Sequence, residues 1–421
     1  MKLLYLTSVL VTGTFLISIN GCMEEPLHAD LSNENLELDT LHLYDIEGET
    51  YQIPPSIGSK TRLSLGVDGE FEYKAILLKT SFVSSESVQL SYASLLDSNI
   101  LIDSAFFTVY LTTDTLINPI SFSLFSFPDQ GDSVFSESKS HYLNFTETEI
   151  ALGQYEASAL EEESEFMVDS VANSVFRARF NVSDMLDSTF MDSSLNYTVM
   201  LTLDNDDGNL HSVYSREYSS LENTTPKLDV YFKQFTYADS ADTSQDTQID
   251  TLQRSFKVIS DLSILVPPDI LDEDSSFISI SRGKGLRSLI SLNFLDTLAL
   301  PNQTTFDKAE LIFHIVPDTT ISSFTLYAIP LQDTVELTNF TYFDEDLFDT
   351  FSYLTVSGTV SDNQVVFNIK RFLQDHYFNH IDNLGIKLYS SVNNSIHSTV
   401  HLYSNADSLL YPKLFIQYVS P

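Results

Sequence analysis

Apolar and polar residues alternate along much of the chain, in short runs separated by Asp, Asn, Ser and Gly. In KAELIFHIV, every second residue from Ala309 to Ile315 is apolar, and SAFFTVYL repeats the pattern from Ala105 to Leu111. A period of two is typical of strands with one buried face, because successive side chains of a strand point to opposite sides. Sustained helical periodicity is nearly absent. The pattern therefore predicts an all-β protein.

The same order of elements occurs twice in the sequence. FNVSDMLDSTF, from Phe180, and FNIKRFLQDHY, from Phe367, each follow a strand pattern with positions i, i+3, i+4, i+7 and i+8 on one helical face. A later TPKLDVYF corresponds to YPKLFIQY at the C-terminus, and Pro226 and Pro412 follow the two phenylalanines by 46 and 45 residues. The first copy carries about 17 extra residues, including ALEEESEF, which we expect to be a loop insertion.

The duplication predicts two tandem antiparallel β-sandwiches, each with one short helix. We expect the first sandwich over residues 36–237 and the second over 254–421. Residues 238–253 are polar and acidic and lack an apolar pattern, so they are predicted to form a linker. Chance similarity between two strand-rich segments is the alternative.

The N-terminus predicts export. MKLLYLTSVLVTGTFLISINGC has one basic residue, an apolar run and small residues before Cys22, which is typical of a bacterial secretory signal. Its last four residues resemble the lipobox of bacterial lipoproteins, and Cys22 is the only cysteine of the chain. We expect residues 1–21 to be a lipoprotein signal peptide cleaved after Gly21. Acyl chains on Cys22 and a tether over 22–35 then anchor the protein to a membrane. An ordinary signal peptide is the alternative.

The residues after Cys22 indicate which membrane is the partner. Met23 stands where an aspartate is associated with retention in the inner membrane, and Glu24 and Glu25 resemble an acidic export signal of some bacterial surface lipoproteins. We expect an outer-membrane lipoprotein on the cell surface, with a periplasmic orientation as the alternative.

The composition restricts the partners further. The formal net charge is −38, whereas nucleic acids and anionic lipids are bound by Lys and Arg, so no nucleic-acid partner is expected. Thirty Phe and 21 Tyr supply apolar volume for real cores. Tyrosine rings also stack on sugars, although the chain has no tryptophan, the strongest residue for such contacts.

Motifs for catalysis are absent from the sequence. It contains no Gly-x-Ser-x-Gly elbow, no phosphate-binding glycine loop and no zinc-protease helix motif, so we expect a non-catalytic protein without a cofactor. Paired carboxylates that only the fold brings together stay open as an alternative.

Metal sites are not predicted either. His376 and His380 are four residues apart, as are His397 and His401, a spacing that could place two ligands on one metal. The first copy of the repeat has no histidines at the positions of the first pair. LDNDDGN, at residues 203–209, is similar to a calcium loop, but its glycine falls one position early, so a hairpin turn is predicted.

The closing half of each copy resembles DNRLRE-type domains. In the second copy Asn383, Gly385 and Ile386 fit the family's middle strand, and PKLFIQY fits its last strand. In the first copy Ser215-Arg216-Glu217 fits the family's S-R-E, which the second copy lacks. The resemblance implies a jelly-roll-like β-sandwich in extracellular modules, some of which bind carbohydrate. A similar resemblance to bacterial surface lipoproteins of the same layout implies no activity.

Three functions therefore fit the sequence. The first is a non-catalytic lipoprotein that binds a polysaccharide, and the second is a structural or adhesive envelope protein without a small ligand. A polysaccharide-degrading enzyme comes third. If each PKL strand closes its own sandwich, a cut in 238–253 should leave two fragments that fold separately.

Overall fold

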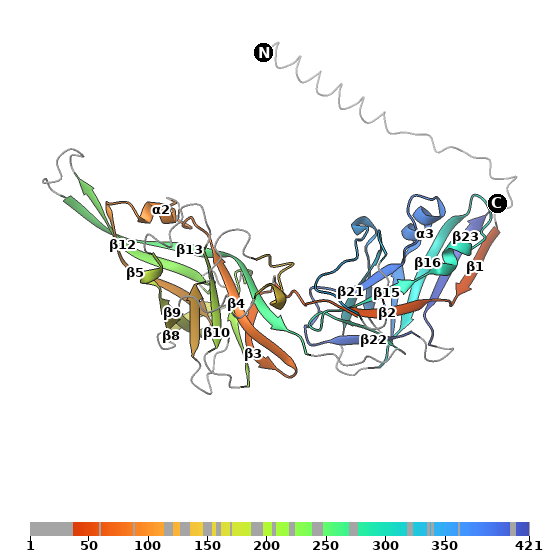
Figure 1. Ribbon diagram of the computed structural model, residues 1–421, viewed down its shortest axis with the longest axis horizontal. Helices are drawn as coiled ribbons and strands as arrows, with labels where there is room; N and C mark the ends of the chain where they lie inside the picture. The colour runs from red at the N-terminus through yellow and green to blue at the C-terminus, as the bar shows by residue number, and fades with distance from the viewer. Residues whose placement is uncertain are drawn as a thin grey trace, which may run out of the picture.

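The structure is a computed structural model with two β-sandwich lobes side by side (Figure 1). It describes residues 37–420 except 59, 87–88, 113–120, 127–134, 146–153, 157–160, 169–170, 187–196, 204–207, 219–223, 238–246, 269–276, 318–322, 335–336, 338–340, 361–362 and 405–409. In this part of the chain the only α-helices are α2 (Tyr92–Leu95) and α3 (Lys370–Tyr377). The predicted all-β fold of two antiparallel, jelly-roll-like sandwiches is confirmed.

The first lobe consists of two sheets. One contains β12 (Lys227–Tyr237), β5 (Ile100–Tyr110), β9 (Val171–Asn181) and β8 (Glu161–Val168), and the other contains β4 (Phe71–Thr80), β10 (Tyr197–Leu203), β6 (Phe122–Ser126) and β7 (Gln154–Glu156). β3 (Arg62–Asp68) pairs with both β4 and β11 (Leu210–Tyr214). The long strand β13 (Thr247–Val266) joins the sheets, because its first half pairs with β12 and its second half with β4.

The second lobe repeats this arrangement. One sheet has the order β1 (Glu37–Leu43), β23 (Lys413–Ser420), β16 (Thr305–His314), β20 (Gln364–Asn368). The other has the order β18 (Thr341–Tyr342), β2 (Glu47–Gln52), β15 (Leu286–Ser291), β21 (Ile386–Ser390), β17 (Phe324–Pro330), β19 (Val356–Val360). Two further strands extend this sheet: β14 (Phe277–Ser281) pairs with β15 and with β22 (Thr399–Tyr403). Short 3-10 helices lie at Tyr142–Asn144, Ser183–Leu186, Asn293–Thr297 and Ser352–Leu354.

The two predicted copies therefore share one topology. Strands β12, β5 and β9 correspond to β23, β16 and β20, and β4, β10 and β6 correspond to β15, β21 and β17. Both PKL motifs begin closing strands, in which Leu228 and Leu414 are buried in the cores. Alternate residues from Ala309 to Ile315 are buried as the pattern predicts.

Each lobe completes its sheets with strands from the other copy. β1 and β2, which precede the first copy, pair with β23 and β15 of the second lobe. β13, which precedes the second copy, pairs with β12 and β4 of the first lobe. The exchanged strands pair with the two PKL strands in the same register: Leu41 lies opposite Ile416 of β23, and Arg254 lies opposite Val230, the corresponding residue of β12. In Figure 1 the red-orange strands β1 and β2 accordingly lie among the blue elements.

This strand exchange changes the predicted domain boundaries. Residues 247–253 of the expected linker form the start of β13, residues 254–266 belong to the first lobe, and residues 37–52 belong to the second. Leu252 packs against the first core, and Phe256 and Val258 are buried in it. The physical reason is local: a hairpin from β12 into β13 closes a short loop, which costs less entropy than recruiting residue 37 from far along the chain.

The predicted short helix has different forms in the two copies. In the second copy α3 buries Phe372 and Leu373, as the periodicity predicts. In the first copy the described part is the 3-10 helix Ser183–Leu186, flanked by buried Val182, and residues 187–190 of the predicted helix lie outside the described residues. SDML is a weaker helix former than KRFLQ, because Ser and Asp compete for backbone hydrogen bonds.

The lobes touch along a mixed boundary. Ile57, Phe71, Tyr73 and Leu265 form a small apolar cluster against which Ile396 of the second lobe packs. Polar contacts surround it: Lys284 Nζ lies 2.7 Å from Glu70 Oε1, and His397 Nε2 lies 3.2 Å from Asp68 Oδ2. These contacts and the exchanged strands hold the two lobes to each other.

Residues 135–145, which we call the wall segment, also reach across the boundary. Phe135, Tyr142 and Phe145 pack on the outer face of the first lobe, against a cluster that includes Leu262 of β13. The hydroxyl of Tyr142 hydrogen-bonds the hydroxyl of Tyr342 in the second lobe at 2.9 Å. The segment therefore forms one side of the space between the lobes.

Candidate functional site

A cleft of about 790 Å³ lies between the two lobes. Its sides are residues 53–56, the wall segment from 135 to 144, the β14–β15 turn with adjoining residues 281–287, residues 345–346, and residues 389–392 at the end of β21. We call the connection from β2 to β3, which begins at Ile53, the first crossing segment. The β14–β15 turn approaches this segment so closely that a side chain at Gly285 would collide with the Ile53 carbonyl, and the φ angle of Gly285 is +68°. The glycine thus allows the turn to present its neighbours to the cleft.

Two basic side chains that line the cleft, Lys139 and Arg282, and the adjacent Lys60 have no carboxylate partner in the part of the chain that the structure describes. Arg282 donates hydrogen bonds to the carbonyls of Val392 and, at 3.4 Å, of Gly58. Lys60 donates to the same Val392 carbonyl at 2.6 Å. Lys139 projects from the wall segment and is exposed. Among the described residues, the ion pairs at this boundary involve other cations, namely Lys284, Arg287, Lys387 and Arg216.

The pKa values of two of these groups are lowered because their charge is poorly compensated. Burial lowers the pKa of Lys60 to about 8, and the nearby charge of Arg282 adds to the effect. Burial likewise lowers the pKa of Arg282 to about 10. Both side chains remain cationic in neutral solution for the most part, at a cost to stability.

The acidic side of the cleft is largely neutralised. Two acidic residues line it, Glu345 and Asp346, and Asp346 forms ion pairs with Arg287 and, at 2.9 Å, with Lys387. Burial would raise the pKa of Asp346, but the charges of Arg287 and Lys387 and the hydrogen bonds to it outweigh burial and hold the pKa below its ordinary value. The hydroxyl of Tyr51, from exchanged strand β2, donates to the same carboxylate at 3.2 Å.

Hydroxyl groups and an aromatic ring complete the lining. Ser136 and Ser138 of the wall segment offer exposed hydroxyls, and Tyr389 of the second lobe offers a half-buried ring that packs on Tyr327. Such a mixture of one ring with several donors and acceptors is suited to a polar ligand with some apolar faces.

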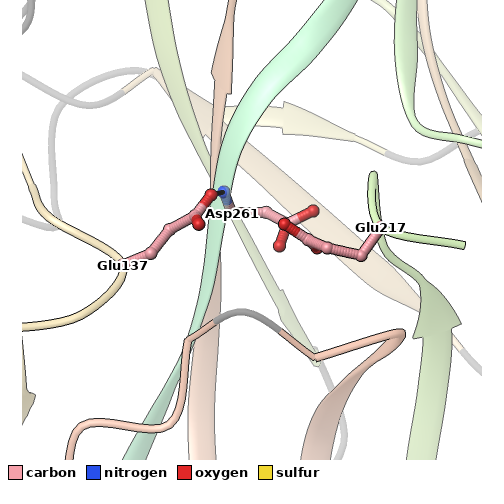
Figure 2. A group of neighbouring side chains, drawn as sticks. All are labelled: Glu137, Glu217 and Asp261. Carbon is pink, nitrogen blue, oxygen red and sulfur yellow. Dashed lines mark hydrogen bonds between the residues drawn. The ribbon is translucent and has the colours of Figure 1, made fainter. Parts of the chain in front are cut away.

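A cluster of three carboxylates lies where the wall segment meets β13 (Figure 2). Glu137 comes from the wall segment, Glu217 from the turn after β11 and Asp261 from β13, and each offers an oxygen within 4.8 Å of the others. Arg216 lies among them: its Nε is 2.9 Å from Glu137 Oε1 and 2.9 Å from Glu217 Oε1. The backbone N–H of Arg216 donates to Asp261 Oδ2 at 2.8 Å, and that of Asp261 donates to Glu137 Oε1 at 2.8 Å.

The carboxylates of this cluster differ in pKa. Burial raises the pKa of Asp261 to about 8, and the charges of Glu217 and Glu137 also raise it. Burial acts in the same direction on Glu137, but hydrogen bonds from Arg216, the Asp261 backbone and Ser260 outweigh it and lower the pKa of Glu137. A protonated acid beside an ionised carboxylate is the pairing that glycoside hydrolases use.

Access argues against such an enzyme role for the cluster. Asp261 is 0% exposed, and both oxygens of Glu137 are engaged by Arg216. A sugar could not reach the raised acid without removing the wall segment. The cluster therefore secures the wall segment to the first lobe, and the open cleft on its other side is the accessible site.

The site residues considered in the sequence lie in several places. Cys22 and Gly21 lie outside the described residues, as do residues 204–207 of the acidic turn. The histidines have separate partners: His376 lies 3.5 Å from Asp296, His397 lies 3.2 Å from Asp68, and His401 hydrogen-bonds Ser279 at 2.8 Å. The exposed His380 lies 3.8 Å from Asp375.

Sequence reasoning missed most of the basic residues of the cleft. Lys60, Lys139 and Arg282 are far apart in the sequence and belong to no motif. The Ser215-Arg216-Glu217 triplet did indicate a special turn, since Ser215 Oγ donates to Glu217 Oε2 at 3.0 Å and the other two side chains join the carboxylate cluster.

Comparison of the chain with known protein-family models and with curated proteins finds no match. In the described part of the chain, no helix combines the length and the apolar character needed to cross a membrane.

Proposed function

We propose that the protein is an outer-membrane or cell-surface lipoprotein, anchored through Cys22, that binds a polysaccharide in the cleft between its lobes without catalysis. The observation that carries the proposal is that Lys139 and Arg282 line the cleft, with Lys60 beside them, and have no carboxylate partner among the described residues of a chain with a net charge of −38. With 59 acidic residues available, such cations would be easy to pair.

The charges favour a ligand with anionic groups. A buried or half-buried cation without a counter-charge destabilises the fold, and a carboxylate or sulfate on a ligand would remove that cost. Nucleic acid also carries anionic groups, but the strongly negative remainder of the surface would repel a long polyanion of high charge density. An acidic polysaccharide with one charge per sugar or fewer fits this balance better.

The size and lining of the cleft support the same ligand class. A volume of about 790 Å³ lies within the range of small-molecule sites, and it suits a short run of sugar rings. Tyr389 offers a ring on which a sugar could stack, and the exposed hydroxyls of Ser136 and Ser138 offer hydrogen bonds to sugar hydroxyls. The resemblance of the closing strands to DNRLRE-type domains points in the same direction.

The strand exchange bears on the anchor. β1 begins at Glu37 and belongs to the second lobe, so a lipid on Cys22 would hold that lobe at the end of a tether of roughly 50 Å at most. The cleft, on the side of this lobe that faces the first lobe, would then be presented away from the membrane.

A structural or adhesive envelope protein is the second candidate. The exchange itself favours it, because pulling on the N-terminal anchor would load β1 against β23 along seven paired residues rather than unravel a terminal loop. This role needs no ligand in the cleft.

A glycan panel separates the two functions. The probe is the purified chain from residue 23 onward, applied to immobilised neutral, carboxylated and sulfated polysaccharides at low salt. Retention on one or more acidic polysaccharides, reduced by salt, is expected if the cleft binds them. Absence of retention on all of them would leave the structural role as the better account, and release of shorter products would indicate an enzyme instead.

A further inference from the structure

We infer that Glu137, Glu217 and Asp261 form a site for one divalent cation that prefers oxygen ligands. The three side chains come from three separate elements, and each offers one oxygen within 4.8 Å of the other two. In Figure 2 the Asp261 side chain points toward Glu217, and the Glu137 carboxylate lies at the backbone nitrogen of Asp261. The inference rests on this cluster alone and does not depend on the ligand of the cleft.

The decisive observation is an unpartnered, fully buried oxygen. Asp261 is 0% exposed, and its Oδ2 accepts the backbone N–H of Arg216, which fixes the carboxylate in place. Its Oδ1 has no hydrogen-bond partner, whereas the buried Glu217 Oε1 lies 2.9 Å from Arg216 Nε as an ion pair without a hydrogen bond of good geometry. Leaving charged oxygens buried and unpaired is costly, so native proteins satisfy them with a proton, a water or an ion.

The charge of the cluster favours a cation over water. Once an ion displaces the proton of Asp261, three ionised carboxylates and one guanidinium leave two negative charges, which a single divalent ion would balance. The donors are all oxygens, with neither histidine nor cysteine among them, and this set suits Ca²⁺ or Mg²⁺ better than Zn²⁺. A proton shared between Asp261 and Glu217 is the competing way to satisfy the unpaired oxygen.

A cation at this point would join three parts of the structure. Glu137 belongs to the wall segment, whose backbone also packs against the first crossing segment: Ser56 Oγ donates to the Glu137 carbonyl at 3.2 Å. Asp261 belongs to the exchanged strand β13, and Glu217 to the turn after β11. The ion would therefore fix both the wall of the cleft and the second half of the exchanged strand.

The test uses the chain from residue 23 onward, freed of metal with EDTA and then titrated with CaCl₂ or MgCl₂ by calorimetry and by thermal unfolding. We expect one saturable site and a midpoint of unfolding that rises with the ion concentration. Asp261→Asn and Glu217→Gln should each weaken the site by about tenfold or more. The exposed Glu72→Gln is the matched control and should leave it unchanged.

The outcomes are distinct. An acidic surface also binds cations diffusely, so the variants must locate the site. If saturable binding survives both Asp261→Asn and Glu217→Gln but is lost in Asp204→Asn/Asp206→Asn, the ion binds in the acidic turn, and the inference is wrong. An unmodified chain that binds neither Ca²⁺ nor Mg²⁺ saturably, while Asp261→Asn is at least as stable, would show that a proton occupies the cluster. Tighter binding of Ca²⁺ than of Mg²⁺ would support the expected irregular, oxygen-rich coordination.

Discussion

The strand exchange predicts a specific cross-link between the ends of the chain. Thr40 of β1 lies opposite Gln417 of β23, and both side chains lie outside the cores. If the strands were not exchanged, β1 would pair with β12, and Thr40 would lie opposite Tyr231. In the structure, the position opposite Tyr231 is taken by Gln253 of the exchanged strand β13. The chain from residue 23 onward has no cysteine, so introduced pairs are the only thiols.

The perturbation is the double substitution Thr40→Cys/Gln417→Cys, compared with Thr40→Cys/Tyr231→Cys. Directly opposed antiparallel residues have Cα separations of about 4.5 to 5.5 Å, within the range of a disulfide. Closing the loop between residues 40 and 417 removes chain entropy from the unfolded state, worth about 5 kcal/mol at most, because engineered disulfides often deliver less than the chain-entropy value. The stabilisation should fall on the second lobe.

The assay is oxidation at low protein concentration, followed by a non-reducing gel, peptide mapping and denaturant unfolding. We expect the first variant to form an intramolecular disulfide and the second to remain reduced. A disulfide in the Tyr231 variant and none in the Gln417 variant would refute the exchange. Cross-linked dimers would mean that the strands are exchanged between chains instead.

Three further predictions follow from the same structure. A protease site placed within 238–246 and then cleaved should give two fragments that stay together in gel filtration, because the second lobe contains strands of both fragments and so does the first. Fragments that separate without denaturant would contradict the exchange. Tyr51→Ala should lower the free energy of unfolding by about 3 to 5 kcal/mol, because Tyr51 is 0% exposed and packs on Phe343 and Phe348. Hydrogen exchange should show the loss of stability in the second lobe. Tyr51→Phe, which removes only the hydrogen bond to Asp346, should lower the free energy of unfolding by about 1 kcal/mol. The lowered pKa of Lys60 means that the unfolded chain binds the Lys60 proton more tightly than the folded chain, so the free energy of unfolding should rise between pH 8 and about 10. This rise should vanish in Lys60→Met, which should also be more stable than the unmodified protein at pH 7 by about 1 kcal/mol after allowance for solvent screening. A variant with an unchanged pH profile would show that the pKa of Lys60 is not lowered in the folded protein.

The sequence pattern predicted the elements well but not their partners. Alternation located strands such as β16, and the helical face at 369–377 located α3, because both depend on which side of a local element is buried. The exchange depends on a choice between two equivalent edges. β1 and the first half of β13 each fit beside a PKL strand, so no local pattern distinguishes β12 from β23 as the partner.

The candidate site was predictable only in part. The Ser215-Arg216-Glu217 triplet marked a turn that takes part in the carboxylate cluster, but Glu137 comes from a segment without any distinctive pattern. The cleft exists because two lobes meet; its unpaired basic residues come from the wall segment and a hairpin turn, and the adjacent Lys60 comes from the first crossing segment. Contacts between residues so distant in sequence depend on tertiary packing, which periodicity does not record.

The central claim is that the cleft binds an acidic polysaccharide through its unpaired cations. The most direct test is the retention of the chain from residue 23 onward on the best acidic polysaccharide of the panel, measured for the unmodified protein, Lys139→Gln/Arg282→Gln and the control Lys233→Gln, which lies on β12 beside Asp103. We predict that the cleft variant loses at least about tenfold in affinity, as expected for two charge-assisted contacts, while the control keeps it. Equal retention of all three proteins would contradict the claim.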